Sequence, residues 1–167
     1  MGRELPKVGS VSLVVSWFGT DLRCGDCTIS PKVEQVTAEA AQPWRVSGLA
    51  RRNAEVVATR EGRPVYGGTP SDGSVIEALT ALAQAGKRAV FYPFILMEQL
   101  RGNARPDPWG GSEQPALPWR GRITLSRAPG EVGSPFGTIA AKAEVARFFG
   151  SARVEDFTAT GTTIVYT

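Results

Sequence analysis

The sequence predicts an α/β fold in which parallel strands alternate with amphipathic helices. Three segments predict it: a β-branched run at Val11–Trp17, a helix-periodic stretch at Ser74–Gly86, and a second apolar run at Ala89–Met97. A strand, a one-sided apolar helix and a strand, in that order, are typical of a parallel β-α-β unit. The 167 residues, of which 42% are hydrophobic and 21% charged, are typical of a single globular domain.

The first strand is expected at Val11–Trp17, between Gly9 and Gly19. Its nearly continuous apolar character favours burial on both faces, as in a parallel sheet. Residues 18–47 show no sustained period and predict an irregular connection. The segment Gly48–Val57 fits either a short helix or a strand, and both alternatives stay open.

The clearest helix follows a loop rich in turn-forming residues. Ser71 or Ser74 can cap it, and Ser74 with Glu77 has the spacing of a reciprocal capping box. Gly86 ends the pattern, as a left-handed cap would. One face carries the apolar residues at helical spacing: Val75, Ile76, Leu79, Leu82 and Ala83.

The pattern of a strand followed by a helix then recurs along the chain. Ala89–Met97 is predicted as a buried strand whose regular part ends near Pro93, because proline donates no ladder hydrogen bond. Arg122–Ser126 is expected as another strand and Thr138–Phe149 as a second amphipathic helix. The alternating tail, Phe157–Tyr166, predicts a small β-hairpin.

Repeated β-α units fit either an open doubly wound sheet or a closed barrel, and composition does not choose between them. A complete eight-stranded barrel takes about 250 residues, whereas this sequence offers only about three core strands. If the fold is a barrel, more than half of it lies outside this chain.

Composition excludes several classes of chemistry. The chain has no histidine, so Ser-His-Asp and Cys-His mechanisms are impossible within it. Cys24 and Cys27 are the only cysteines, too few for a structural zinc site, and we expect no metal and no cofactor. A loop with a local disulfide is the favoured interpretation of this pair, and a redox-active pair in an independent small protein is the weaker alternative.

The charge pattern argues against a nucleic-acid partner. The formal net charge is +3, and the basic residues are scattered along the chain. The adjacent pair Arg51 and Arg52 is interpreted as solvated surface. No window approaches the roughly 20 consecutive apolar residues of a membrane-spanning helix, so no membrane span is expected.

Five peptides carry a more specific resemblance. In chain order they are Ser12–Cys27 (SLVVSWFGTDLRCGDC), Gly62–Asp72 (GRPVYGGTPSD), Phe91–Met97 (FYPFILM), Asp107–Gly111 (DPWGG) and Pro118–Ile123 (PWRGRI). Together they resemble the TIM-barrel-like, glycoside-hydrolase-like domain of the host-specificity baseplate protein of gene transfer agents and related tailed phages. The resemblance runs from about Leu5 to the end of the chain.

This resemblance implies that residues 1–167 form a single partial TIM-barrel-like domain, an arc of parallel strands incomplete at both ends, with long loops and a C-terminal β-hairpin. It implies a virion component at the tail tip of a phage-like particle, made in the bacterial cytoplasm. The implied partners are other baseplate and tail proteins and the host cell-wall glycan, a peptidoglycan-like polymer. The parent domain would be glycoside-hydrolase-like, whereas this fragment alone is expected to be inactive.

Glycoside hydrolysis needs two carboxyl groups on either side of the scissile bond, and in a TIM barrel they follow the strands. The candidates are Asp21, Glu98, Asp107 and Glu113. Each has a structural alternative as a loop or surface carboxylate. Asp72, at the start of a helix, is expected to cap or line its first turn.

Four aromatic residues are expected at strand ends or in the loops that follow, where flat apolar rings can stack on sugars: Trp17, Tyr92, Trp109 and Trp119. Packing beneath the long loops is the alternative for each of them. Two functions are therefore favoured over the redox alternative: a carbohydrate-active baseplate domain, and a structural, non-catalytic module for baseplate assembly.

Overall fold

The computed structural model describes residues 7–38, 42–117, 123–160 and 163–166. Over this range the chain is a mixed α/β protein with small sheets and two α-helices. It divides into two compact units. The first unit comprises Met1–Thr20, Ile29–Asn103 and Pro115–Gly121, and the second comprises Asp21–Thr28, Ala104–Gln114 and Arg122–Thr167.

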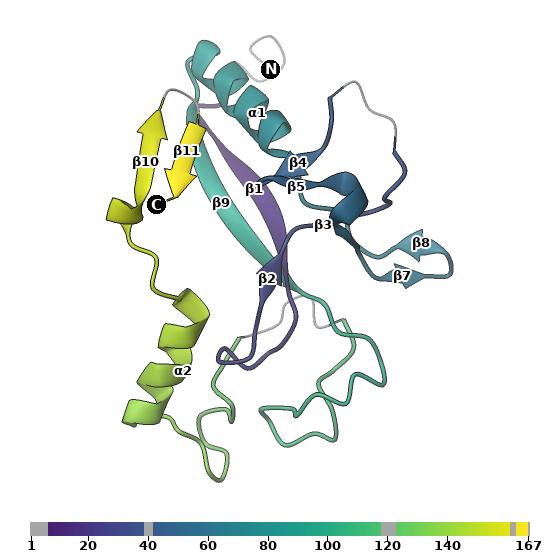
Figure 1. Ribbon diagram of the computed structural model, residues 1–167, viewed down its shortest axis with the longest axis vertical. Helices are drawn as coiled ribbons and strands as arrows, with labels where there is room; N and C mark the ends of the chain where they lie inside the picture. Colours follow the sequence, from purple (N-terminus) through teal and green to yellow (C-terminus); the bar gives the residue numbers. More distant parts are fainter. Residues whose placement is uncertain (1–6, 39–41, 118–122, 161–162, 167) are drawn as a thin grey trace. The chain divides into compact units, whose positions relative to one another are not determined.

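The first unit is built on two long parallel strands. β1 (Ser10–Gly19) pairs with β9 (Arg88–Met97) over ten residues, and the two run side by side in Figure 1. The short β2 (Ile29–Ser30) pairs antiparallel with β1 on its other side. Helix α1 (Asp72–Gln84) comes between the two long strands in the sequence and contacts β9. This arrangement confirms the predicted β-α-β unit.

The strand predictions fail in three details, the first being that the expected burial of β9 is wrong for residues 89–93, all of which are exposed. β9 continues through Pro93 to Met97, so the expected end near Pro93 is wrong. β9 is an edge strand of its sheet, and an edge strand accommodates a proline whose missing N–H faces away from its neighbour. The expected burial of β1 on both faces is also wrong for its first half, where exposed and partly buried residues alternate and Val14 is 47% exposed.

Helix α1 begins one turn earlier than the capping-box spacing predicts. The Ser71 side chain is the N-cap and accepts a hydrogen bond from the Ser74 N–H at 3.1 Å. Ser74 therefore lies inside the first turn, and the predicted Ser74–Glu77 box is not formed. The helix ends at Gln84, and Gly86 follows with a φ of 64°, as expected for a left-handed residue after a helix.

Short strands fill the connection between β2 and α1. β3 (Lys32–Val33) pairs in parallel with β6 (Glu55–Val56), whereas two hairpins join β4 (Arg45–Val46) to β5 (Leu49–Ala50) and β7 (Thr59–Arg60) to β8 (Arg63–Pro64). A 3-10 helix, η1, occupies Arg51–Asn53. The ambiguous segment 48–57 therefore contains both kinds of structure.

Two clusters of buried apolar side chains support the first unit. One joins the short strands to β1, because Trp17 and Leu49 pack on Val33, Trp44, Val46 and Ala54. The other lies around the ends of the long strands, where Tyr66 and Phe94 pack on Phe18, Val57 and Leu96. The carboxyl ends of β1 and β9 are thus anchored, while their first halves are more exposed.

The second unit contains helix α2 (Ile139–Phe149), a short 3-10 helix η2 (Val154–Asp156), and the hairpin of β10 (Phe157–Thr160) and β11 (Thr163–Tyr166). The second helix and the C-terminal hairpin are confirmed. The strand predicted at Arg122–Ser126 is wrong: its described residues form only an isolated bridge between Thr124 and Arg23. No helix in the described part of the chain is long and apolar enough to cross a membrane.

Candidate functional site

Glu98 lies in the first unit, directly after β9. Its N–H donates to the Gly19 carbonyl at 3.0 Å, which extends the β1–β9 pairing by one step. Its carboxylate accepts hydrogen bonds from the backbone N–H of Ala58 and from Lys32 Nζ, and the side chain is only 5% exposed. Glu98 therefore joins the end of β9 to two segments that are distant in sequence.

Lys32 is the cation of this cluster, and its side chain is 12% exposed. Its Nζ lies 3.0 Å from Glu55 as well as contacting Glu98. Burial lowers the pKa of Lys32, but hydrogen bonds to Glu98 and Glu55 outweigh burial and leave the pKa raised. The ammonium group thus stays charged and holds the Glu98 carboxylate in place.

The Tyr66 hydroxyl is buried near this ion pair. Among the described residues it has no hydrogen-bond partner. Burial, and then the negative charge of Glu98, raise the pKa of Tyr66, so its hydroxyl stays protonated at neutral pH. The side-chain amide of Gln99, which is 1% exposed, likewise has no partner within the described ranges.

Asp21 lies in the second unit and is almost fully buried, with 4% of its surface exposed. It accepts hydrogen bonds from the Arg23 backbone at 2.8 Å, from the Arg23 guanidinium at 2.8 and 3.0 Å, and from Gln114 Nε2 at 2.7 Å. Burial raises the pKa of Asp21, but the bonds from Arg23 and Gln114 outweigh burial and lower it. Asp21 is therefore ionised at neutral pH and is unsuited to act as a proton donor.

Gln114 connects Asp21 to the loop at 104–114. Its Nε2 also donates to the Pro106 carbonyl at 3.0 Å, and its Oε1 accepts from the Leu22 N–H at 2.9 Å. The sequence analysis missed this residue. Its partner Asp21 is 93 positions away, and a glutamine without a motif carries no signal of such a contact.

Asp107 and Glu113 organise the same loop. The Asp107 carboxylate accepts from the backbone N–H groups of Trp109 at 3.3 Å and Gly111 at 3.0 Å, an arrangement typical of an aspartate that stabilises a turn. Glu113 accepts from the Ala104 N–H at 3.2 Å. These contacts shape the loop that carries Trp109, whose surface is 38% exposed.

Two of the other candidate aromatics, Trp17 and Tyr92, lie in different environments. Trp17 is partly buried against the cluster around Trp44. Tyr92 lies in the middle of β9, opposite Val14, so its expected place at a strand end is wrong because β9 continues past Pro93. Tyr92 is 49% exposed. Trp119 lies outside the described residues.

The four candidate carboxylates thus share one property: each accepts hydrogen bonds from backbone N–H groups. Asp21, Asp107 and Glu113 belong to the second unit and Glu98 to the first. Asp72 has a similar role, since its carboxylate accepts from the Ser47 N–H at 2.8 Å. These contacts position strand ends and loops, which is the structural alternative raised for these residues.

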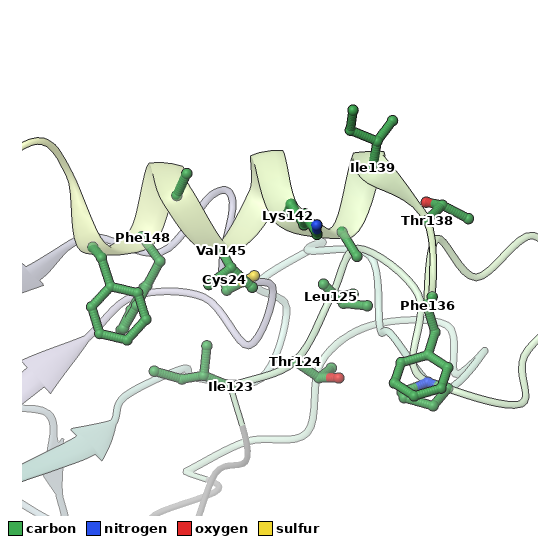
Figure 2. Close-up of a pocket in the computed structure, with 15 residues that line it drawn as sticks. Cys24, Ile123, Thr124, Leu125, Phe136, Thr138, Ile139, Lys142, Val145 and Phe148 are labelled. Atoms are coloured by element: carbon green, nitrogen blue, oxygen red, sulfur yellow. The ribbon is translucent and has the colours of Figure 1, made fainter.

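An apolar pocket of about 990 Å³ lies in the second unit, between α2 and residues 123–125. Figure 2 shows Cys24 in its wall, together with Leu125 and Val145. Cys24 and Cys27 are not joined to each other, so the expected local disulfide is not formed. Burial, and then the charge of Glu144, raise the pKa of Cys24, which disfavours the reactive thiolate.

Comparison with known proteins adds no identification: the chain matches no protein-family model, and no curated protein is significantly similar to it.

Proposed function

We propose that this chain is part of the glycoside-hydrolase-like TIM-barrel domain of a tail baseplate protein, at the tip of a phage-like particle, and that it acts on or binds host cell-wall glycans. The observation that carries the proposal is the ordered set of five peptides. Two of them, Ser12–Cys27 and Phe91–Met97, include most of β1 and β9. In this proposal the two strands are neighbours in a barrel arc, with α1 as their connecting helix.

Binding is favoured over cleavage for the chain taken alone. Asp21 is held ionised, and the carboxylates of Glu98, Asp107 and Glu113 are each bonded to backbone N–H groups. A glycosidase needs one carboxyl group that donates a proton and a second that stays ionised. By contrast, the indole of Trp109 is partly exposed on an ordered loop, as a sugar-stacking platform requires.

Sedimentation with purified cell walls tests this proposal. We expect the full chain to co-sediment with peptidoglycan, and Trp109→Ala to reduce the bound fraction severalfold. Phe149→Ala is a matched control, because it removes another exposed aromatic ring of the second unit, outside the loop. No sedimentation by the chain or by its parent protein would contradict the proposal, and so would equal losses in both variants.

A structural assembly module is the second candidate function, favoured by the surface of α2. The buried residue of this helix is Glu144, whereas Ile139 is 85% exposed and Phe149 is 73% exposed. Phe136, which also lines the adjoining pocket, is 67% exposed. Exposed apolar patches of this kind commonly mark protein–protein contacts.

Incorporation into tail particles separates the two functions. If the chain acts in assembly, Ile139→Ser with Phe149→Ser abolishes incorporation of the parent protein into particles, while wall sedimentation is unchanged. If the chain binds glycans instead, Trp109→Ala reduces wall sedimentation and leaves incorporation into particles unchanged. Normal incorporation of the double variant would contradict the assembly function.

A further inference from the structure

A second pocket, in the first unit, gathers basic side chains. It has a volume of about 420 Å³ and lies beside the β4–β5 hairpin and η1. Arg45, Arg51 and Arg52 line it together with Trp44 and Gln42. The sequence analysis interpreted Arg51 and Arg52 as solvated surface and did not connect them with Arg45, because the hairpin that brings them together was not predicted.

Part of this pocket is held rigidly. Trp44 is 8% exposed, and its Nε1 donates to the Thr69 carbonyl at 2.7 Å. The Arg51 guanidinium lies 5.8 Å from the centre of the Trp44 ring and donates through Nη1 to the Gln35 carbonyl at 2.9 Å. One guanidinium group is therefore preorganised, while Arg45 and Arg52 are exposed and free to adjust.

The positive charge of this pocket is not balanced within the described part of the chain. None of the three arginines forms an ion pair with a described carboxylate, and none of the described residues that line the pocket is acidic. Like charges gathered in a concave site repel one another, and an anion placed between them removes that repulsion. Guanidinium groups suit carboxylates and phosphates because they donate two parallel hydrogen bonds.

We propose that this pocket binds the anionic group of an acidic sugar, a carboxylate or a phosphate carried on a sugar ring. The guanidinium groups of Arg51 and Arg52 would contact the anion, and Arg45 would contribute from the neighbouring hairpin. The sugar part of this inference rests on the proposed function, whereas the anion-binding part rests on the pocket alone. The residues that line this pocket do not include those of the loop that carries Trp109.

An extended nucleic acid fits these observations less well. Nucleic-acid binding requires a continuous track of basic groups that follows the phosphates. Here three arginines surround one small pocket, and the net charge of the whole chain is only +3. A compact ligand with one anionic group is the better match.

Calorimetric titration of the full chain tests the inference with three probes: N-acetylmuramic acid, N-acetylglucosamine 6-phosphate and neutral N-acetylglucosamine. We expect one or both acidic sugars to bind, which identifies the anion, and the neutral sugar to bind at least about tenfold more weakly. Arg52→Gln and Arg51→Gln should each weaken acidic-sugar binding about tenfold, the effect of about 1.4 kcal/mol. Arg51→Lys should weaken it too, since lysine keeps the charge but not the paired donors.

Arg63→Gln is the matched control. Arg63 lies exposed in β8 of the same unit, outside the pocket, and its replacement changes the net charge equally. The affinity of Arg63→Gln for the acidic sugars should stay within about twofold of the unmodified chain, as expected for an exposed charge outside the pocket, which salt and solvent screen. Arg52 is exposed, so Arg52→Gln keeps the test valid even if Arg51→Gln fails to fold.

Several outcomes overturn the inference: equal affinity for acidic and neutral sugars, equal losses in Arg52→Gln and Arg63→Gln, or tighter, Arg52-dependent binding of a single-stranded oligonucleotide. The proposed function fails separately. If the chain sediments with cell walls but its binding of acidic sugars does not depend on Arg52, only the inference about this pocket is contradicted. Arg52-dependent binding of the acidic sugars without any wall sedimentation supports the pocket and contradicts the wall-binding function.

Discussion

The Glu144 carboxylate accepts two hydrogen bonds from Ser126, one from the backbone N–H and one from the hydroxyl, each 2.7 Å long. Glu144 is 8% exposed and is the buried residue of α2, a helix whose apolar side chains are largely exposed. Helix α2 is thus attached to Ser126 by a polar contact, whereas most helices are attached by the packing of an apolar face. The consequence is that the stability of the second unit depends on one carboxylate.

Replacing Glu144 by Ala should therefore destabilise the second unit by about 2 kcal/mol, because two partly buried donors of Ser126 lose their acceptor. Glu144→Gln should cost less, since the amide oxygen still accepts from the N–H and the Ser126 hydroxyl can accept from the amide group. Urea unfolding of the full chain, followed by hydrogen exchange in α2, measures both. Lys142→Ala, at an exposed position of the same helix, is the control. An Ala variant as stable as this control would show that the Ser126 contact is dispensable.

Asp21 should make the free energy of unfolding decrease at acidic pH. Its pKa in the folded chain lies below the ordinary value of 3.8, so the unfolded chain binds the proton more tightly. The stabilisation from its bonds with Arg23 and Gln114 is present above about pH 4 and is lost as the pH falls through the folded-state pKa. Asp21→Asn should reduce stability at pH 7 by about 3 kcal/mol, because it leaves buried donors and the Arg23 charge poorly matched.

The measurement for Asp21 is the unfolding free energy between pH 2 and pH 7, with Asp26→Asn as the control. Asp26 also pairs with Arg23, at 3.2 Å, but its side chain is 51% exposed. Surface ion pairs contribute little, so this control should follow the unmodified chain closely. Parallel pH curves for unmodified and Asp21→Asn protein would rule out the expected role of the carboxylate.

Lys32 and Glu98 should behave as a coupled pair. Lys32→Met leaves the Glu98 carboxylate buried without its cation, and a loss of about 3 kcal/mol is expected. The double variant Lys32→Met, Glu98→Gln should be more stable than the sum of the two single losses predicts. In the unmodified chain the raised pKa of Lys32 means that its contribution is present below about pH 10.5 and lost as the pH rises through the folded-state value.

Chemical unfolding of the four proteins in this cycle gives the coupling energy, and Glu55→Gln is the control. Glu55 also contacts Lys32, but its side chain is 69% exposed and should contribute less than about 1 kcal/mol. Strictly additive losses would indicate that Lys32 and Glu98 act independently.

Local sequence patterns predicted the elements whose determinants are local. Helix α1 is indicated by the spacing of its own apolar residues and by the adjacent cap, Ser71. The β10–β11 hairpin is indicated by the alternation of residue types along its own strands. The strand predicted at Arg122–Ser126 failed because a pentapeptide of alternating polar and apolar residues becomes a strand only with a partner, and Thr124 has only a bridge to Arg23. The prediction that β9 ends near Pro93 failed because a strand tolerates proline when it lies at the edge of its sheet, as β9 does.

For the candidate site, the sequence predicted which carboxylates follow strands but not which residues they contact. The sequence places Asp21 and Glu98 after strands, and the structure agrees that each follows one of the two long strands. Their partners Gln114 and Lys32 lie far away in sequence, and these partners decide whether a carboxylate is free for chemistry. The cluster of Arg45, Arg51 and Arg52 similarly depends on a hairpin that no residue pattern indicated.

Gly68 lies in the loop rich in turn-forming residues that precedes α1, and its surroundings leave little room for a side chain. A Cβ added at Gly68 would lie 2.8 Å from the Lys32 carbonyl oxygen and 3.0 Å from a carboxylate oxygen of Glu34. The Gly68 N–H also donates to Glu34 at 2.6 Å, so the loop cannot simply move away without losing this bond. Gly68→Ala should therefore destabilise the first unit by about 1 to 3 kcal/mol.

Gly9→Ala provides the comparison, since a Cβ at that position meets no atom within 4 Å. This control should be neutral or slightly stabilising, because alanine restricts the unfolded chain more than glycine does. Thermal unfolding of both variants measures the difference. Because the Lys32 carbonyl belongs to the residue whose ammonium group holds Glu98, Gly68→Ala should also weaken the Lys32–Glu98 coupling. A Gly68→Ala protein as stable as Gly9→Ala would show that the loop is not tightly packed against β3.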